Sequence, residues 1–424
     1  MINTKISRKF FDQVVLKIKI LHTSDWHIGR KLHERDRYDE MQKFFSWLEL
    51  ELERENINAL IISGDIFDNT TPSNQAREIY YSFLARVAKS SCRHVIIIAG
   101  NHDSANFLEA PAKTLELLDI HVIGQITDNI DDEIITLEDS NGNPELIVCA
   151  VPFLRDRDVR TANSENNLDS RQQDLINGIH AHYQKVFERS AEIRGDSKIP
   201  VVATGHLFIE EAKAEGEEHR ELYLGTIIKI SLKSGIFPAK LVDYVALGHL
   251  HSKSGSQRVR YSGSPIPMTF SEASHKKYVE IVEFDENCKP KIQDVQIPTF
   301  RKLARIKGDW QMIDSRISEY VKSGEAAWLE ITYTGQELLD IRERIEKKLK
   351  FFPELEALTI YNETREKLNS ADPDDVIIQN GKTLDEILPE EIFKLKLKAN
   401  KIPDEQQDAF MSMYREILDE IQHA

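Results

Sequence analysis

The sequence predicts an α/β protein whose layered sheets are flanked by helices, followed by a small α+β unit and a helical tail. Three observations lead to this class. Short runs rich in Val and Ile recur between about residues 15 and 285, and helical patterns follow the first runs. After about residue 297 the pattern of apolar and polar residues changes. Runs that are apolar almost throughout are typical of strands buried on both faces, as in layered α/β domains.

Eight runs have the composition of buried strands, with β-branched residues at many positions. They are "VLKIKILH" (15–22), "NALIIS" (58–63), "HVIIIA" (94–99), "ELIVCAV" (145–151), "IPVVAT" (199–204), "DYVALG" (243–248), "RVRYSG" (258–263) and "KYVEIVEF" (277–284). Apolar spacing indicates helices near 37–55, 73–90 and 105–118. In such domains ligands gather where strands end and loops begin.

The rest of the chain divides into further units. The strand-like segments "RKLARIKGDW", "AWLEITYTG" and "LEALTIYNE" alternate with the helical segments "QMIDSRISEYV" and "QELLDIRERIEKKL", which predicts a β-α-β-α-β order. The Asp, Asn, Pro and Gly content of "TREKLNSADPDDVIIQNG" is typical of a linker. We expect an N-terminal extension (1–15), a main domain (16–297), a small domain (298–365), a linker (366–382) and a helical tail (383–424).

Two helices are expected in the tail. Thr383 and Glu386 form a capping box, and a second helix from about Asp404 carries an apolar stripe. The stripe consists of Phe410, Met413, Tyr414, Ile417, Leu418 and Ile421. Packing on its own domain and docking on a partner chain both explain such a stripe, and both stay open at this point.

Charge and cysteine content restrict the function classes. The 424 residues carry a formal net charge of −16, which argues against a generic nucleic-acid coat. Any nucleic-acid contact must be local or come partly from a partner chain. The cysteines, Cys92, Cys149 and Cys288, are too far apart for a disulfide framework or a thiolate metal site. No apolar run reaches the roughly 20 residues of a membrane span, and we find no signal-peptide core, so we expect a soluble cytoplasmic protein.

Five of the predicted strands end in side chains that can bind a metal ion. The first is followed by Asp25 and His27, and the others lead into the motifs "GDIFD", "GNHD", "TGH" and "GHLH". The polar motif residues are Asp65, Asp68, Asn101, His102, Asp103, His206, His249 and His251. A single polar strand end is more often structural, but five unrelated ends seldom share one ligand chemistry. We therefore interpret them as one metal centre.

The ligand types narrow the choice of metal. Carboxylates, imidazoles and one amide oxygen without thiolate suit Mn²⁺, Fe²⁺, Mg²⁺ or Zn²⁺ and disfavour a structural zinc site. Seven candidate ligands are too many for one tetrahedral ion and fit two ions that share a bridging carboxylate. They are Asp25, His27, Asp65, Asn101, His206, His249 and His251. Two divalent cations carry four positive charges, of which Asp25 and Asp65 neutralise only two. The natural guest of such a pocket is a phosphate.

These motifs resemble a known family. The order "DWH", "GDIFD", "GNHD", "GH" and "GHLH" is similar to the five motifs of calcineurin-like metallophosphoesterases, over residues 20–285. The segments "GDIFDNTTPS", "VPFLRDRDVR" and "YSGSPIP", with the C-terminal architecture, look like the DNA-nuclease branch of that family. The resemblance implies a layered two-sheet core, a DNA-binding cap domain at 298–365, and phosphodiester hydrolysis with two metal ions, Mn²⁺ being the expected metal.

The resemblance also assigns a role to each motif residue. Asp25, His27 and His251 would hold one metal, Asp65 would bridge, and Asn101, His206 and His249 would hold the other. His102 would not be a ligand but would stabilise or protonate the leaving oxygen. Some relatives have a histidine where this chain has Asp68, so a second imidazole role is not assumed and Asp68 is placed behind the ligands. Residues 1–15 precede the usual start of the first motif and receive no function.

Residues beside the motifs have competing interpretations. Asp103 is expected to orient His102 or its loop without binding metal. Trp26 either packs beneath the loop, which is the more common outcome, or stacks on substrate. Two basic runs are either solvated surface or contacts to a DNA backbone. The first run is Arg30, Lys31, Arg35 and Arg37, and the second is Arg155, Arg157 and Arg160.

By this resemblance the protein is expected to be a Mn²⁺-dependent DNA exonuclease and endonuclease of DNA repair and recombination, acting on duplex ends, single strands and hairpins. Its expected partners are DNA, a coiled-coil ABC-type ATPase bound by the C-terminal helices, and a second copy of the nuclease chain. A phosphoesterase for small molecules or phosphoproteins is one alternative, and a non-catalytic scaffold subunit is another. The complete ligand set argues against the scaffold, because a relic would be expected to have lost His102, Asp65 or His249.

Overall fold

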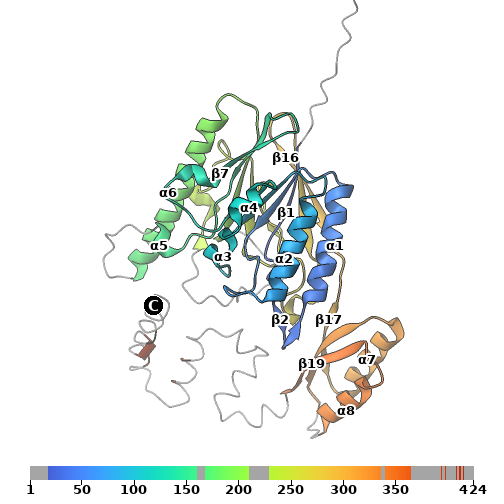
Figure 1. Cartoon of the computed structure of the whole chain (residues 1–424). Coiled ribbons are helices and arrows are strands. Elements are labelled where there is room, and N and C mark those ends of the chain that lie inside the picture. Colours follow the sequence, from blue (N-terminus) through green and yellow to red (C-terminus); the bar gives the residue numbers. More distant parts are fainter. Residues whose placement is uncertain are drawn as a thin grey trace, which may run out of the picture.

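Two six-stranded sheets packed face to face form the centre of the computed structural model (Figure 1). The structure describes residues 18–159, 168–209, 229–335 and 340–363, and in addition the single residues 393, 397, 407, 410, 411 and 414. Helices pack on the outer face of each sheet, so the main domain has the layer order helix, sheet, sheet, helix. A smaller domain with a three-stranded sheet follows.

The first sheet has the order β16-β15-β1-β4-β5-β6. Its strands are β1 (Lys19–Thr23), β4 (Ala59–Ser63), β5 (His94–Ile98), β6 (Ile120–Ile123), β15 (Tyr278–Phe284) and β16 (Pro290–Gln296). The neighbouring strands β1, β4, β5 and β6 run parallel, and helices make the crossovers between them. These helices are α1 (Tyr38–Arg54), α2 (Asn74–Val87), α3 (Ala105–Glu109) and α4 (Ala112–Glu116).

The second sheet has the order β13-β14-β12-β9-β8-β7. Its strands are β7 (Ile134–Glu138), β8 (Pro144–Cys149), β9 (Val201–His206), β12 (Tyr244–Gly248), β13 (Ser254–Gly255) and β14 (Val259–Tyr261). The long helix α6 (Leu168–Arg194) packs on its outer face through Tyr183, Val186 and Phe187. An apolar core that includes Ile61 and Ala246 fills the space between the two sheets.

Short elements occupy the connections between these strands. They are β2 (Lys31–Leu32), β3 (Arg35–Asp36), η1 (Ile130–Glu133), α5 (Asp156–Val159), β10 (Phe208–Ile209), β11 (Lys229–Ile230), η2 (Leu232–Ser234) and η3 (Phe270–Glu272). β2 and β3 form an antiparallel hairpin directly after the first strand. This hairpin and η3 both reach the small domain.

The small domain has the predicted β-α-β-α-β order. Its elements are β17 (Lys302–Gly308), α7 (Trp310–Ser323), β18 (Ala327–Tyr333), α8 (Ile341–Leu349) and β19 (Leu355–Asn362). The three strands are parallel, and the apolar stripes of both helices pack on the sheet through residues such as Ile313, Ile317 and Ile345. Sequence periodicity located these elements because each is a separate amphipathic segment.

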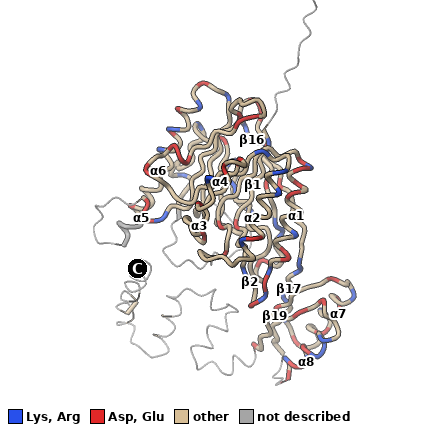
Figure 2. The backbone as a smooth tube through the Cα atoms, in the orientation of Figure 1, with Lys and Arg blue, Asp and Glu red and all other residues tan. Residues whose placement is uncertain are grey.

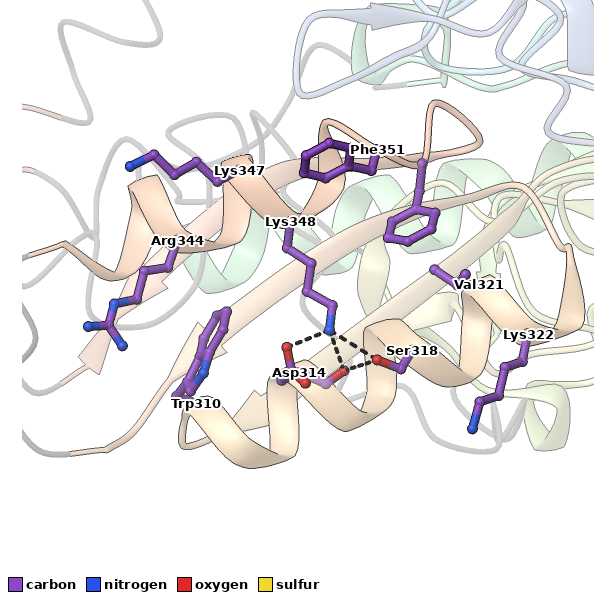
Figure 3. Close-up of a pocket in the computed structure, with 10 residues that line it drawn as sticks. Trp310, Asp314, Ser318, Val321, Lys322, Arg344, Lys347, Lys348 and Phe351 are labelled. Carbon is purple, nitrogen blue, oxygen red and sulfur yellow. Dashed lines mark hydrogen bonds and ion pairs between the residues drawn. The ribbon is translucent and has the colours of Figure 1, made fainter.

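A groove of about 620 Å³ lies between α7 and α8 (Figure 3). Trp310, Val321 and Phe351 supply apolar surface, and Lys322 and Arg344 lie along its rim. Lys348 crosses the groove, donating from Nζ to the carbonyl of Asp314 at 3.1 Å and to Ser318 Oγ at 3.0 Å. This lysine ties the two helices together.

A small apolar cluster seats the small domain on the main domain. Its buried members are Leu32, Phe270, Leu303 and Trp328. The guanidinium of Arg301 lies 4.4 Å from the ring centroid of Trp328 and donates to Asp39 Oδ2 at 2.7 Å. The junction therefore combines apolar burial with one arginine that contacts both domains.

The predicted fold class is confirmed, and every predicted strand run contains an observed strand. The helix expected over 105–118 is wrong in one respect, because it divides into α3 and α4 at Pro111. Proline lacks the N–H that a continuous helix needs, so Pro111 interrupts the backbone hydrogen bonds between the two segments. None of the described helices is long and apolar enough to cross a membrane.

The N-terminal extension (1–15) and the linker (366–382) lie outside the described residues, and so does the helical tail (383–424) except for six single residues. Among these six, the rings of Phe393 and Tyr414 stack with centroids 4.2 Å apart. Leu397 and Met411 are buried. The two parts of the tail therefore contact each other through the rings of Phe393 and Tyr414.

Candidate metal centre

Polar residues from five strand ends meet at one edge of the two-sheet core. β1, β4 and β5 of the first sheet end there, as do β9 and β12 of the second. Backbone hydrogen bonds join the loops, since Asp25 N donates to Gly64 O at 3.0 Å and His27 N donates to Asp65 O at 3.0 Å. Parallel strands bring their carboxyl ends to the same edge, so the topology itself gathers these side chains.

Four of these residues have left-handed backbone. The φ angle is 53° at Asp25, 45° at His27, 51° at Asp65 and 101° at His249. Side chains with a Cβ rarely adopt this region, and each instance costs about 1 kcal/mol or more. Backbone strain of this kind concentrates at functional sites.

Asp25, His27 and His251 form a first group of donors. One donor atom of each lies within 4.8 Å of the others. Nε2 of His27 is 3.1 Å from Nε2 of His251, and the buried Asp25 accepts the backbone N–H of His249 at Oδ1, at 2.8 Å. Two imidazoles and a carboxylate at this spacing can hold one divalent cation.

Asp65, Asn101, His206 and His249 form a second group. Asn101 Oδ1 lies 3.0 Å from His206 Nε2 and 3.2 Å from His249 Nδ1. Asp65 Oδ2 lies 3.2 Å from His206 Nε2 and 3.5 Å from His27 Nε2, so this carboxylate faces both groups. One carboxylate between two sets of donors suits a pair of cations that share it.

Burial and charge set the protonation of these groups. Burial holds the pKa of His27 and of His249 well below the ordinary histidine value, so both rings are neutral and able to bind a metal. Burial also lowers the pKa of His206, but the Asp65 carboxylate outweighs it and raises that pKa to about 9. Although burial raises the pKa of Asp65, His206 holds it well below its usual range. A cation would displace the proton that this pair retains.

His102 lies beside both groups and is fixed by the neighbouring loops. Its ring nitrogen Nδ1 is 2.9 Å from the carbonyl oxygen of Asp68, and its backbone N donates to Asp65 Oδ1 at 3.0 Å. Its ring meets that of His27 edge to face, with centroids 4.9 Å apart. Because the carbonyl engages Nδ1, Nε2 is the nitrogen that can face a substrate.

The carboxylate of Asp103 is hydrogen-bonded to the loops that follow β4 and β5. Its buried carboxylate accepts backbone N–H groups from Ile66 at 3.0 Å, Phe67 at 2.9 Å and Gly100 at 2.9 Å. Burial and the charge of Asp65 raise the pKa of Asp103 to about 6, although these N–H groups lower it. Its observed contacts are thus with loop backbone.

Comparison with known proteins identifies the family. A model described as "Calcineurin-like phosphoesterase" matches residues 18–253, and one described as "Type 5 capsule protein repressor C-terminal domain" (SbcD_C) matches residues 299–401. The SbcD subunit of nuclease SbcCD from Escherichia coli strain K12 is 31% identical over 409 residues, covering 95% of this chain and 98% of the relative. The chain belongs to the SbcD family of calcineurin-like phosphoesterases.

Other members of the SbcD family are similar over shorter stretches. The corresponding SbcCD nuclease subunit of Rhodobacter capsulatus is 32% identical, covering 65% of this chain and 68% of the relative. That of Bacillus subtilis is 28% identical, covering 77% of this chain and 81% of the relative. Among solved structures, a dimetal phosphatase from Danio rerio matches with a TM-score of 0.38 and 13% identity, over 66% of this chain and 98% of that chain. This structural similarity is weak, so the family assignment rests on the sequence matches.

Membership in this metallophosphoesterase family implies divalent metal ions, and the residues of the SbcD-family chain fit them. The clustered donors are buried or half-buried carboxylates and imidazoles, to which Asn101 adds an amide oxygen. The low pKa values of His27 and His249 keep these rings in the metal-binding form. The donor set is therefore appropriate for divalent cations that accept nitrogen and oxygen ligands.

The structure corrects one member of the first basic run. Arg37 is only 2% exposed, and it donates to Glu40 Oε1 at 3.0 Å and to Glu40 Oε2 at 2.7 Å. An arginine buried in this way does not face a DNA backbone, so that interpretation of Arg37 is wrong. Arg37 instead forms a buried ion pair with Glu40 at the start of α1.

The other described members of the two basic runs are exposed or half-buried, and Figure 2 shows Lys and Arg positions mixed with Asp and Glu positions along the chain. Arg30 donates to Asp68 at 3.2 Å, Lys31 lies 3.7 Å from Asp36, and Arg35 pairs with Glu356 of the small domain. In the second run, Arg155 Nη2 approaches the carbonyl of Asp103 at 3.5 Å and Arg157 Nε lies 3.6 Å from Asp158. Arg160 lies outside the described residues.

Trp26 packs beneath the loop, as the more common interpretation expects. The side chain is fully buried, its Nε1 donates to Thr23 Oγ1 at 3.0 Å, and its ring contacts Phe45 with centroids 4.8 Å apart. It is not positioned to stack on a substrate.

Sequence reasoning missed two polar residues behind His251. Glu272 lies on η3 and Lys277 follows it, and both are buried near the ring or backbone of His251. The only signal was an acidic and a basic residue five positions apart, directly after the "YSGSPIP" loop. Such a spacing is too common to single out.

Proposed function

We propose that this SbcD-family protein is a Mn²⁺-dependent DNA nuclease subunit that hydrolyses phosphodiesters at a two-metal centre. The observation that carries the proposal is the meeting of seven nitrogen and oxygen donors from five strand ends at one edge of the core. The relatives described above, each named as part of nuclease SbcCD, support a nuclease over other phosphoesterases.

In this proposal each group of donors holds one cation. Asp25, His27 and His251 hold the first, and Asn101, His206 and His249 hold the second, with Asp65 between them. Mn²⁺ fits the mixed imidazole, carboxylate and amide donors, which Mg²⁺, Fe²⁺ and Zn²⁺ also accept. Bound cations would supply Lewis-acid chemistry and neutralise charge on the phosphate.

The surrounding residues of the chain would orient and protonate the reacting groups. His102, held at Nδ1 by the carbonyl of Asp68, would present Nε2 to the leaving oxygen and stabilise or protonate it. Asp103 would keep the loops of β4 and β5 in register. Two carboxylates against two divalent cations leave the pocket cationic, which favours a phosphodiester guest.

The proposal extends to substrates and partners. The DNA substrates are duplex ends, single strands and hairpins, processed in the cytoplasm during repair and recombination. An SbcC-like coiled-coil ABC-type ATPase would dock on the helical tail (383–424), and two copies of the main domain would form a homodimer. The net charge of −16 is compatible with such a complex if the partner supplies much of the DNA-holding surface and the small domain (298–365) contacts DNA locally.

The test is to incubate the purified chain and its His102→Leu variant with Mn²⁺ and end-labelled duplex or hairpin DNA, with and without the ATPase. The wild-type chain should cut the DNA, a chelator should abolish cutting, and the variant should lose at least a hundredfold in rate. No products from the wild type, even with the ATPase, would contradict the nuclease. Equal cutting by both proteins would reveal a contaminant.

The alternatives make different predictions for small substrates. A small-molecule phosphoesterase would hydrolyse nitrophenyl phosphates or cyclic nucleotides rapidly and leave DNA intact. A scaffold subunit would hydrolyse neither substrate and would bind no Mn²⁺ in a direct titration.

The role of the tail is tested by deletion of residues 380–424. The shortened chain should retain intrinsic Mn²⁺-dependent cutting, because the metal centre lies within the main domain, but it should no longer bind the ATPase. Unchanged complex formation would refute docking through the tail.

A further inference from the structure

Glu272 is a buried carboxylate behind His251, on the side of the ring away from the first donor group. Glu272 is 5% exposed, and its Oε1 lies 3.6 Å from Nδ1 of His251. The other ring nitrogen, Nε2, lies 3.1 Å from Nε2 of His27. The imidazole of His251 therefore stands between a carboxylate and the proposed first metal position.

Lys277 holds this carboxylate and the backbone of His251 at the same time. Its buried Nζ pairs with Glu272 Oε2 and donates to the carbonyl of His251 at 2.9 Å and to Ser264 Oγ at 3.0 Å. The backbone N of Met268 donates to Glu272 Oε2 at 3.2 Å. With Oε2 engaged twice, Oε1 is the oxygen directed at the imidazole.

Stability alone does not account for this buried pair. Taking a carboxylate and an ammonium out of water is energetically costly, and well-packed apolar residues often serve a fold equally well. The Lys277 ammonium and the backbone N–H of Met268, both on Oε2, favour the ionised form of this carboxylate. An ionised carboxylate accepts a hydrogen bond from an imidazole N–H.

We propose that Glu272 is a positioning residue that accepts the Nδ1 proton of His251 and so presents Nε2 of that ring to the first metal. The proposal rests on the proposed function, since it takes His251 as a metal ligand. At 3.6 Å the contact is longer than a hydrogen bond, and a small rotation of either side chain closes it. A carboxylate in this position fixes the tautomer and raises the basicity of the ligand ring.

The first test needs no metal and no variant of Glu272. The full chain is labelled with ¹⁵N at histidine, and the His251 signals are assigned by comparison with a His251→Gln variant in metal-free buffer. The neutral ring of His251 should carry its proton on Nδ1. A proton on Nε2 instead would overturn the proposal, whatever the stability of any variant.

The second test compares Glu272→Gln with a matched control, Glu40→Gln. Glu40 is also a buried carboxylate, 1% exposed, at the start of α1, and it contacts Arg37 and Arg301. Glu272→Gln should shift the His251 tautomer and weaken Mn²⁺ binding at one of two sites about 10-fold to 100-fold, measured by direct titration of the protein. Glu40→Gln should leave the His251 tautomer and Mn²⁺ binding unchanged.

The activity of Glu272→Gln adds a readout that a purely structural role would not produce. Nuclease activity lost at low Mn²⁺ concentration should return at high Mn²⁺ concentration, because a weakened site can still be filled. Unchanged tautomer and affinity in a folded Glu272→Gln protein would refute the positioning role while leaving the nuclease intact. Absence of Mn²⁺ binding by the wild type would instead refute the proposed function itself.

Discussion

The carboxylate of Asp103 joins two loops that follow different strands. Asp103 lies after β5, and the amides of Ile66 and Phe67 that donate to it lie after β4. A third N–H, from Gly100, donates to the same carboxylate. Because these donors are buried, the loops depend on an acceptor with two oxygen atoms at this position.

Replacement of Asp103 by Asn should destabilise the fold without removing a metal donor. The amide can still accept at one oxygen, but its NH₂ group would face a backbone N–H where the second carboxylate oxygen now accepts. We expect the free energy of unfolding to fall by about 2–3 kcal/mol. Denaturant titration measures this loss, and Asp131→Asn at an exposed ion pair with Arg189 should cost much less, because water screens that pair. Equal losses would show that the loop contacts of Asp103 carry no special weight.

The cysteines should differ in reactivity. Burial raises the pKa of Cys92 and of Cys149 to about 12, whereas Cys288 is only half-buried. At pH 8.5 a thiol reagent should modify one cysteine of the native protein and all three after denaturation, and Cys288→Ser should remove the native reaction. In the unfolded chain the thiols ionise near pH 9, whereas Cys92 and Cys149 stay protonated in the native protein up to about pH 12. The free energy of unfolding should therefore fall as the pH rises from about 9 to 12. Rapid native labelling of Cys92 or Cys149 would contradict their burial.

Strands were easier to predict than the roles of single residues, because each apolar run of the sequence contains one strand. The strand ends of β1, β4, β5, β9 and β12 could be located because each run stops at a polar motif. The helix α6 was not predicted, although Leu175, Ile179 and Tyr183 recur at four-residue spacing on its buried face. The packing of one sheet against the other could not be predicted, because it depends on contacts between residues far apart in the chain.

Gly248 marks a position where the two sheets approach too closely for a side chain. A Cβ at this residue would overlap the carbonyl oxygen of Ser63 and lie 2.8 Å from Nδ1 of His206. Since Nδ1 of His206 is already 2.9 Å from that same oxygen, Gly248→Ala should displace the imidazole and strain the sheet contact. We expect a loss of about 1–3 kcal/mol in stability and weaker Mn²⁺ binding.

The matched control for this substitution is Gly142→Ala, in an exposed turn with φ of 79°. It should cost about 1 kcal/mol through backbone strain alone and leave Mn²⁺ binding unchanged. Thermal unfolding and Mn²⁺ titration of both variants distinguish the two effects. Normal Mn²⁺ binding by Gly248→Ala would show that the sheets can separate locally without moving His206.

The whole molecule depends on a junction that the sequence did not reveal. Leu32, Phe270, Leu303 and Trp328 come from four distant segments, and none of them belongs to a motif. Their meeting follows from tertiary packing, which the apolar period of a single segment cannot specify. The order of elements within the small domain was nevertheless predicted, because that order depends only on local patterns.

Loss of Trp328 should separate two activities of the proposed nuclease. Trp328→Ala removes the ring that contacts Arg301 and the apolar cluster, so the small domain should move relative to the main domain. Cutting of duplex DNA should fall at least tenfold, whereas hydrolysis of a small diester such as bis-nitrophenyl phosphate should change less than twofold. Trp310→Ala, on the groove side of the same domain, should spare both activities. Parallel loss of both substrates in Trp328→Ala would show that the junction supports the metal centre itself.

The left-handed backbone at Asp25, His27, Asp65 and His249 bears on whether the chain is an enzyme or a scaffold. Glycine would relieve most of the backbone strain at each position. All four side chains carry donor atoms of the two groups, so backbone strain and metal-binding chemistry coincide at the same four positions. A chain maintained only for its shape has no use for donors at strained positions, so this coincidence favours the proposed metal-dependent enzyme over a scaffold.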